Sequence, residues 1–146
     1  MKKIFLLSLI TYLSMVSTNL IAQTPLTLNL LCQINGEITG ISSSPNPLTK
    51  VPISGSMSIL VENGFIVSSD TNNYFSSKVP ATIESDRIFG FAQWRDDDAE
   101  NKLVIDVNRN TGMLRVSKEK TLMKASIFLD AKASGSCEKM ANRRKF

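Results

Sequence analysis

The fold is decided by the stretch Lys102-Leu103-Val104-Ile105-Asp106-Val107-Asn108-Arg109-Asn110-Thr111-Gly112-Met113-Leu114-Arg115-Val116-Ser117. Apolar side chains alternate with polar ones on both sides of a central break, which is typical of two half-buried β-strands. Within the break, Asn110 and Gly112 tolerate the positive φ that a tight turn requires. The stretch therefore predicts an antiparallel β-hairpin.

The same pattern recurs along most of the chain and predicts an all-β domain, an antiparallel meander of about eight strands. Asn63-Gly64, the dipeptide best suited to a type I′ turn, separates strands predicted at 56–62 and 65–69. The proline-rich segment 42–55 is predicted as a loop, and a helical turn is allowed near 97–101. Further strands are predicted at 26–34, 37–41, 78–84, 87–94 and 122–132, with turns at Asn35-Gly36 and Ser85-Asp86.

The first 22 residues have the three parts of a secretory signal peptide. Lys2 and Lys3 precede an apolar run of about a dozen residues, and Ala22 stands where cleavage would leave Gln23 as the mature start. Polar residues 17–19 interrupt the run short of the roughly 20 apolar residues that a membrane-spanning helix needs. We therefore expect a signal peptide at 1–22, a single β domain at 23–146, and a periplasmic or secreted location.

The charge of the mature chain is nearly balanced. Two of the 17 basic residues lie in the signal peptide, so 15 remain against 13 acidic residues, a net charge of +2. This balance gives no support to wholesale attraction to nucleic acid or anionic lipid. We expect a monomer that binds no nucleic acid and, after cleavage, no membrane. Basic residues do gather in a terminal tail, which is predicted to be solvated, with docking to an acidic partner as the alternative.

The chain has two cysteines, Cys32 and Cys137, one near each end of the mature sequence. In an oxidising compartment such a pair predicts a disulfide. There is no Cys-x-x-Cys motif to support thiol redox chemistry. Because bridged Cα atoms lie within about 7 Å, the first and last strands should be close neighbours. This is the closure condition of a barrel, so we favour a small barrel over the alternative, a two-layer sandwich.

The sequence predicts no catalytic residue, no cofactor and no metal site. The chain has no histidine, which excludes Ser-His-Asp and Cys-His catalysis and histidine-bound zinc. Residues 106–117 space oxygen atoms as a calcium loop does, but Thr111 and Ser117 replace the glycine and glutamate that such a loop needs. A structural turn explains this segment better.

One stretch could form a binding surface, and it comprises Trp94, Arg95, Asp96, Asp97 and Asp98. A tryptophan at a strand end beside an arginine could line a ligand mouth or a partner surface, although packing at the rim of the core is the simpler interpretation. The three aspartates are predicted to form a solvated loop, with a weak calcium site as the alternative.

Three short motifs carry a resemblance to known sequences. They are Leu30-Leu31-Cys32-x-x-x-Gly36, the hairpin Ile105 to Gly112, and Ser134-Gly135-Ser136-Cys137 followed by Lys145-Phe146. Together they resemble a group of small, uncharacterised exported proteins of Gram-negative bacteria. The resemblance implies export and a disulfide, and it implies no activity.

We therefore expect a non-catalytic binding module for a small ligand or a protein partner. A small barrel can hold one small ligand at its mouth. One alternative is a periplasmic or secreted inhibitor of a host or competitor enzyme, with the loop 42–55 or 96–101 entering a cleft. An alternative of another class is a carboxylate-dependent enzyme acting on envelope glycans, which requires two acidic side chains about 5–10 Å apart in one pocket.

Overall fold

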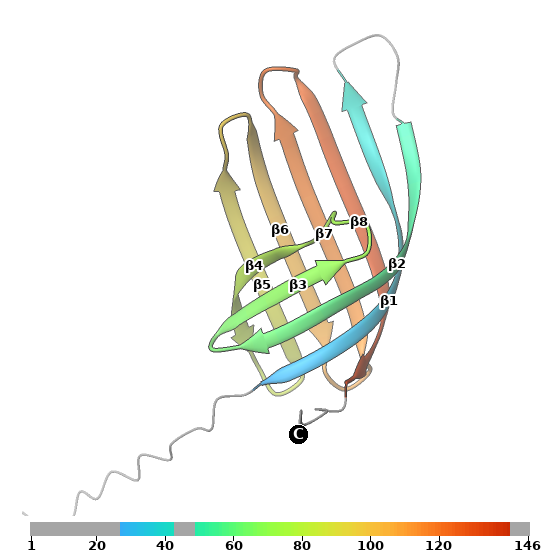
Figure 1. The fold of residues 1–146 in the computed structure, drawn as a ribbon, viewed down its shortest axis with the longest axis vertical. Helices are drawn as coiled ribbons and strands as arrows, with labels where there is room; N and C mark the ends of the chain where they lie inside the picture. Colours follow the sequence, from blue (N-terminus) through green and yellow to red (C-terminus); the bar gives the residue numbers. More distant parts are fainter. Residues whose placement is uncertain (1–26, 43–48, 141–146) are drawn as a thin grey trace, which may run out of the picture.

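A computed structural model describes residues 27–42 and 49–140. The predicted signal peptide, the middle of the proline-rich segment and the basic tail from 141 lie outside these residues. In the described part the chain forms an all-β, closed antiparallel barrel, as predicted, with no helix (Figure 1). No described helix is thus long and apolar enough to span a membrane. The strands, in both chain and barrel order, are β1 (Leu28–Ser42), β2 (Thr49–Glu62), β3 (Phe65–Asp70), β4 (Ser77–Ile83), β5 (Arg87–Arg95), β6 (Ala99–Asn108), β7 (Met113–Leu122) and β8 (Ile127–Lys139).

The barrel closes where β1 pairs with β8, so the first and last strands are neighbours as predicted. Cys32 lies directly opposite Cys137 in this pair, and the two form a disulfide. Cys137 lies within β8 rather than just beyond the last strand, because β8 continues well past the end predicted for it at residue 132.

The hairpin of β6 and β7 is confirmed. Its turn is held by the Asn108 side chain, whose Oδ1 accepts hydrogen bonds from the backbone N–H groups of Asn110 (3.0 Å) and Thr111 (2.9 Å). Gly112 takes the positive φ, at 70°, whereas Asn110 does not. The hairpins of β2 with β3 and of β4 with β5 are confirmed too, and the first of them turns at Asn63 (φ 51°) and Gly64 (φ 77°).

Four local predictions were wrong. Asn35-Gly36 is not a turn, because β1 runs unbroken from Leu28 to Ser42 and pairs along its length with β2 and β8. The predicted loop 42–55 is strand in its described part, since β1 extends to Ser42 and β2 begins at Thr49, whereas residues 43–48 lie outside the described residues. The region predicted as one strand, 122–132, contains the turn between β7 and β8, and residues 99–101 are strand rather than a helical turn.

The barrel has two different ends, because β3 and β4 are short (Figure 1). We call them the core end and the open end. At the core end the wall is complete and encloses fully buried residues such as Met57, Ile59, Ile66, Leu103 and Ile105. Toward the open end, β5 has no partner on its β4 side beyond Gly90, and β2 has none on its β3 side before Met57, among the described residues. The longer strands therefore continue as an open, curved sheet.

Candidate functional site

The predicted binding surface lies at the open end, and the structure divides it between two faces. Trp94 is half-buried on the inner face of β5, where it packs against the edge of the core. Arg95 is exposed on the outer face, where its Nη2 atom lies 3.3 Å from Glu100 Oε1. Trp94 and Arg95 therefore cannot contact one ligand from the same side of the sheet.

Asp96 forms the turn that leads from β5 into β6. Its carboxylate accepts hydrogen bonds from the backbone N–H of Ala99 (2.9 Å) and from Asn101 Nδ2 (3.0 Å). Burial of the carboxyl by itself would raise its pKa. The bonds from Asn101 and from backbone N–H groups, together with nearby Lys120, outweigh burial and lower the pKa of Asp96 below its ordinary value. Asp96 is therefore an ionised structural acceptor that also places negative charge at the open end.

The other acidic residues of this turn point to different partners. Asp98 forms an ion pair with Lys124, and Glu100 pairs with Arg95, whereas Asp97 is exposed. Among residues 27–42 and 49–140, no three Asp, Glu, Cys or His side chains are grouped so that they could hold a metal ion. The described turn gives no support to the calcium alternative.

Trp94 has neighbours on the inner face that come from other strands. Residues directly opposite in a sheet share a face, so the strand register identifies them. One row crosses the sheet through Asn101, Lys120 and Leu129, and the next row toward the core crosses through Lys118 and Ile38. We call this set the mouth surface: Trp94, Asn101, Lys118, Lys120, Leu129 and Ile38.

Lys118 is the centre of the mouth surface. Its Nζ atom lies 5.7 Å from the centroid of the Trp94 ring, a cation–π contact. Burial lowers the pKa of Lys118, neighbouring Lys120 lowers it further, and Asp70 and Asp96 oppose these effects. Neither lysine forms a hydrogen bond or an ion pair with any described residue. Two ammonium groups thus share one face without a directly bonded counter-ion.

Asp70 is near Lys118 but is engaged in a structural role. Its carboxylate accepts hydrogen bonds from the backbone N–H groups of Tyr74 (3.0 Å) and Phe75 (2.8 Å) and from the Ser76 hydroxyl (3.1 Å). These bonds hold the turn between β3 and β4 and place the Phe75 ring in the core, fully buried. Among the described residues, the Asp70 carboxylate is therefore committed to its own turn and forms no direct bond with either lysine.

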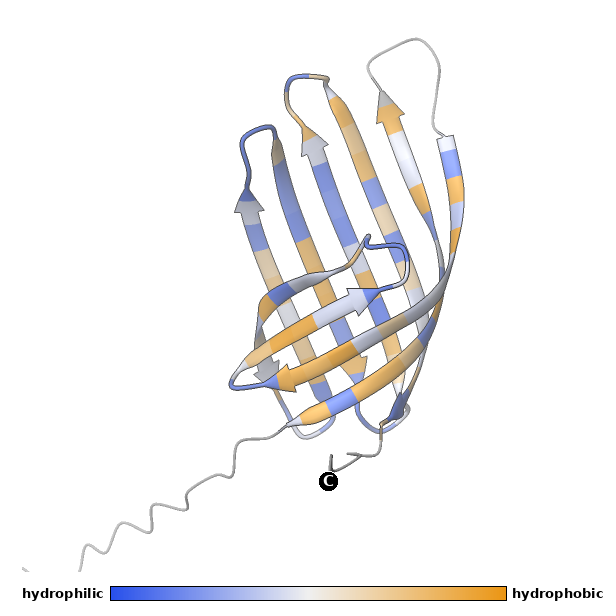
Figure 2. Cartoon of the chain, viewed as in Figure 1, coloured by the Kyte–Doolittle hydropathy of each residue, from blue (hydrophilic) through white to orange (hydrophobic). Residues whose placement is uncertain are grey.

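The mouth surface is chemically asymmetric. Figure 2 shows polar residues along the upper parts of β6 and β7, and apolar residues along the upper part of β8. On the inner face this places the two lysines beside Leu129 and Ile38, both of which are half-buried. An anionic group would fit the lysine side, and a hydrocarbon chain or ring would fit the other side.

The sequence pattern pointed to Trp94 but to neither lysine. One signal could have found them, because the alternation that points Leu114 and Val116 inward continues at 118 and 120. Comparison with other proteins adds nothing to this site: no family model matches the chain, and no curated protein matches it in sequence.

Proposed function

We propose that the protein is exported and serves as a non-catalytic binding module that holds an anionic amphiphile on the mouth surface. Such a ligand has an oxyanion, for example a carboxylate or a sulfate, attached to an apolar chain or ring. The observation that carries the proposal is the pair of lysines, 118 and 120, that face inward without a directly bonded counter-ion. A partly buried charge without a partner is costly, and a bound anion would remove that cost.

The apolar side of the mouth surface supports an amphiphile rather than a bare anion. Leu129 and Ile38 offer hydrocarbon surface beside the lysines, and the Trp94 ring adds a flat apolar wall. A ligand could reach this surface between β2 and β5, whose upper parts lack a neighbouring strand on that side among the described residues. Burial of the ligand's chain would supply the affinity, and the lysines would supply the selectivity for an anion.

The disulfide supports the export part of the proposal. A bond between Cys32 and Cys137 is compatible with an oxidising compartment such as the periplasm or the exterior of the cell. The predicted signal peptide points to the same compartments.

The lysines have a competing structural explanation. The methylene stems of lysines can cover apolar surface while their ammonium groups stay in water. Lys118 and Lys120 lie on β7, which is paired on both sides, and their stems could cover the upper end of the core in this way. If this explanation holds, the lysines bind no ligand. A binding experiment distinguishes this structural role from the proposed ligand binding.

The glycan-enzyme alternative gains no support from the described residues. Glu37 and Asp106 are two acids that line one pocket on the outside of the barrel. Three strand spacings separate them, roughly 14 Å, which is wider than a catalytic carboxylate pair requires. Each is also ion-paired, with Lys50 and with Arg87. The inhibitor alternative stays a prediction.

Trp94 is the only tryptophan of the chain, so its fluorescence reports directly on the mouth surface. We expect dodecanoate, kept below its micelle-forming concentration, to change this fluorescence in a saturable way. Dodecyltrimethylammonium, which has the same chain and the opposite charge, should cause no saturable change. Equal responses to both compounds, or no response to dodecanoate, would contradict the proposal.

A further inference from the structure

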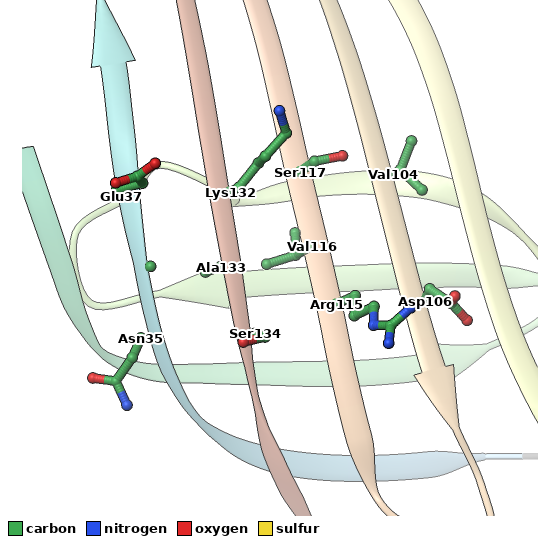
Figure 3. A pocket seen from close by; sticks show the side chains of 11 residues that line it. Asn35, Glu37, Val104, Asp106, Arg115, Val116, Ser117, Lys132, Ala133 and Ser134 are labelled. Carbon is green, nitrogen blue, oxygen red and sulfur yellow. The ribbon is translucent and has the colours of Figure 1, made fainter. Parts of the chain in front are cut away.

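A pocket lies on the outer face of the barrel, away from the mouth surface. It has a volume of about 470 Å³ and crosses four neighbouring strands, β6, β7, β8 and β1. Figure 3 shows side chains of these strands projecting into it. We call this pocket the outer groove, and its polar lining includes Asn35, Asp106, Arg115, Ser117, Lys132 and Ser134.

Two cations and two hydroxyls occupy the centre of the outer groove. Arg115 on β7 lies directly opposite Ser134 on β8, and Ser117 lies directly opposite Lys132. The four side chains therefore form the corners of a diamond on two adjacent strands, with cation and hydroxyl alternating. All four can donate a hydrogen bond, so the centre of the groove favours an acceptor such as an oxyanion.

Arg115 is the member of this group that is free to bind a ligand. Its side chain extends toward Asp106 in Figure 3. Both carboxylate oxygens of Asp106 are already held by Arg87, through Nε at 2.7 Å and Nη2 at 2.9 Å. Within residues 27–42 and 49–140, Arg115 forms no hydrogen bond or ion pair, and neither Ser117 nor Ser134 uses its hydroxyl in one. Lys132 is paired with Asp130.

The surroundings of the diamond limit the charge of the ligand. Glu37 and Asp106 lie at opposite ends of the groove. Together with Arg115 and Lys132 they give the charged residues of its lining a net charge of zero. A dianion such as phosphate would be repelled from both ends, whereas a monoanion can sit at the cationic centre. The volume exceeds what an isolated carboxylate group fills and lies within the range of small-molecule sites, so the ligand has a body beyond its carboxylate. Val104 supplies apolar lining for that body.

We infer that the outer groove is a binding site for a small monocarboxylate, whose carboxylate is held by the Arg115 guanidinium and the hydroxyls of Ser117 and Ser134. The planar fork of an arginine matches a carboxylate with two parallel hydrogen bonds. This site is separate from the mouth surface, which lies on the inner face. It does not depend on the proposed function.

The test follows 4-fluorobenzoate by ¹⁹F NMR as the purified protein is titrated. Saturable broadening or shift of the fluorine signal is expected, and 4-fluorobenzamide, which lacks the charge, should show neither. Arg115→Gln should weaken binding about tenfold or more, because it removes a charge-assisted pair. Arg115→Lys keeps the positive charge but loses the planar fork of the guanidinium. Its affinity for 4-fluorobenzoate should therefore lie between those of the unaltered protein and of Arg115→Gln.

Two matched variants make the result specific. Arg95→Gln removes an arginine from the outer face outside the groove, and Lys118→Met alters the mouth surface alone. Arg95→Gln should bind 4-fluorobenzoate as the unaltered protein does. Because 4-fluorobenzoate is also an anion with an apolar ring, Lys118→Met removes the part of the signal that comes from the mouth surface, and the effect of Arg115→Gln should persist in the Lys118→Met background. A circular dichroism melt confirms that each variant is folded. The inference is overturned if no saturable binding occurs, if Arg115→Gln binds equally well, or if Lys118→Met abolishes binding instead.

Discussion

Lys118 shows how a single residue can link stability to pH. Its pKa is lowered in the folded barrel, mainly by burial and then by Lys120. Between that lowered pKa and the ordinary lysine value of 10.5, the unfolded chain binds more protons than the folded chain does. The free energy of unfolding contributed by this group therefore rises with pH across that window. Below the lowered pKa, Lys118 is charged in both the folded and the unfolded chain, so the full cost of its partly buried charge lowers the free energy of unfolding.

Replacing Lys118 by methionine should separate stability from binding. Lys118→Met removes a partly buried charge and keeps a long apolar stem, so the free energy of unfolding at pH 7 should rise by up to about 1 kcal/mol. The rise of stability with pH in the alkaline range should shrink. Affinity for dodecanoate should fall about tenfold or more. Urea denaturation at neutral and alkaline pH, with the Trp94 titration, measures all three.

Lys102 provides the matched control. It lies on the neighbouring strand and on the outer face, where its Nζ atom lies 3.3 Å from Glu119 Oε1. Lys102→Met should change the free energy of unfolding by no more than about 0.5 kcal/mol and leave dodecanoate binding unchanged. A Lys118→Met protein that behaves as Lys102→Met does in both respects would favour a purely structural role for Lys118.

At the scale of an element, β1 shows why a turn dipeptide can lie inside a strand. Asn35-Gly36 has the composition of a hairpin turn, yet β1 continues through it because β2 and β8 pair on both sides. Gly36 is required there by close packing. A Cβ atom at this position would lie 2.6 Å from the Cα of Ala133 and would collide with the carbonyl oxygen of Lys132. The short-range pattern contains no information about this contact.

Two alanine substitutions on β1 test the close approach. Gly36→Ala should lower the free energy of unfolding by about 1–3 kcal/mol, because the atoms that must move belong to the backbone of β8. Gly40→Ala, on the same strand and face, meets the end of the flexible Leu129 side chain at 3.4 Å and the backbone oxygen of Thr49 at 4.0 Å, both ordinary contact distances. It should cost less than about 0.5 kcal/mol. Equal effects in thermal denaturation would contradict the packing argument.

Most of the fold could be predicted from the sequence, whereas the site could be predicted only in part. Alternation and turn dipeptides act over a few residues, and they predicted the hairpins and the approximate number of strands. The barrel closure followed from the disulfide predicted between Cys32 and Cys137. The segment 117–120 reads Ser-Lys-Glu-Lys and has no apolar residue of its own to mark the inner face. Which of its side chains point inward can be found only by continuing the strand alternation from the apolar core residues that precede it. The outer groove is lined by residues of four strands, so no single segment of the sequence predicts it.

The described part of the molecule is a barrel whose wall is complete at the core end and open at the other end. Its seam between β1 and β8 is held by backbone pairing and by the disulfide, which joins residues 105 positions apart in sequence. Constraining so long a loop in the unfolded chain is expected to stabilise the fold by about 4–5 kcal/mol in the chain-entropy description, with smaller values often measured.

Removing the disulfide should therefore weaken the whole barrel. The double variant Cys32→Ala with Cys137→Ala should lose about 2–5 kcal/mol of unfolding free energy and melt at a lower temperature. Intact mass before and after reduction and alkylation counts the thiols that become accessible. Thiols that react without reduction, or a double variant as stable as the parent, would contradict a stabilising bond.

The central claim, that the open end holds an anionic amphiphile, is tested most directly by a crystal structure of the protein with dodecanoate at saturating concentration. We expect the carboxylate to lie within hydrogen-bonding distance of the Lys118 or Lys120 ammonium, with the hydrocarbon chain along Leu129 and Ile38. A structure in which dodecanoate lies elsewhere, or in which the mouth surface stays empty, would contradict it.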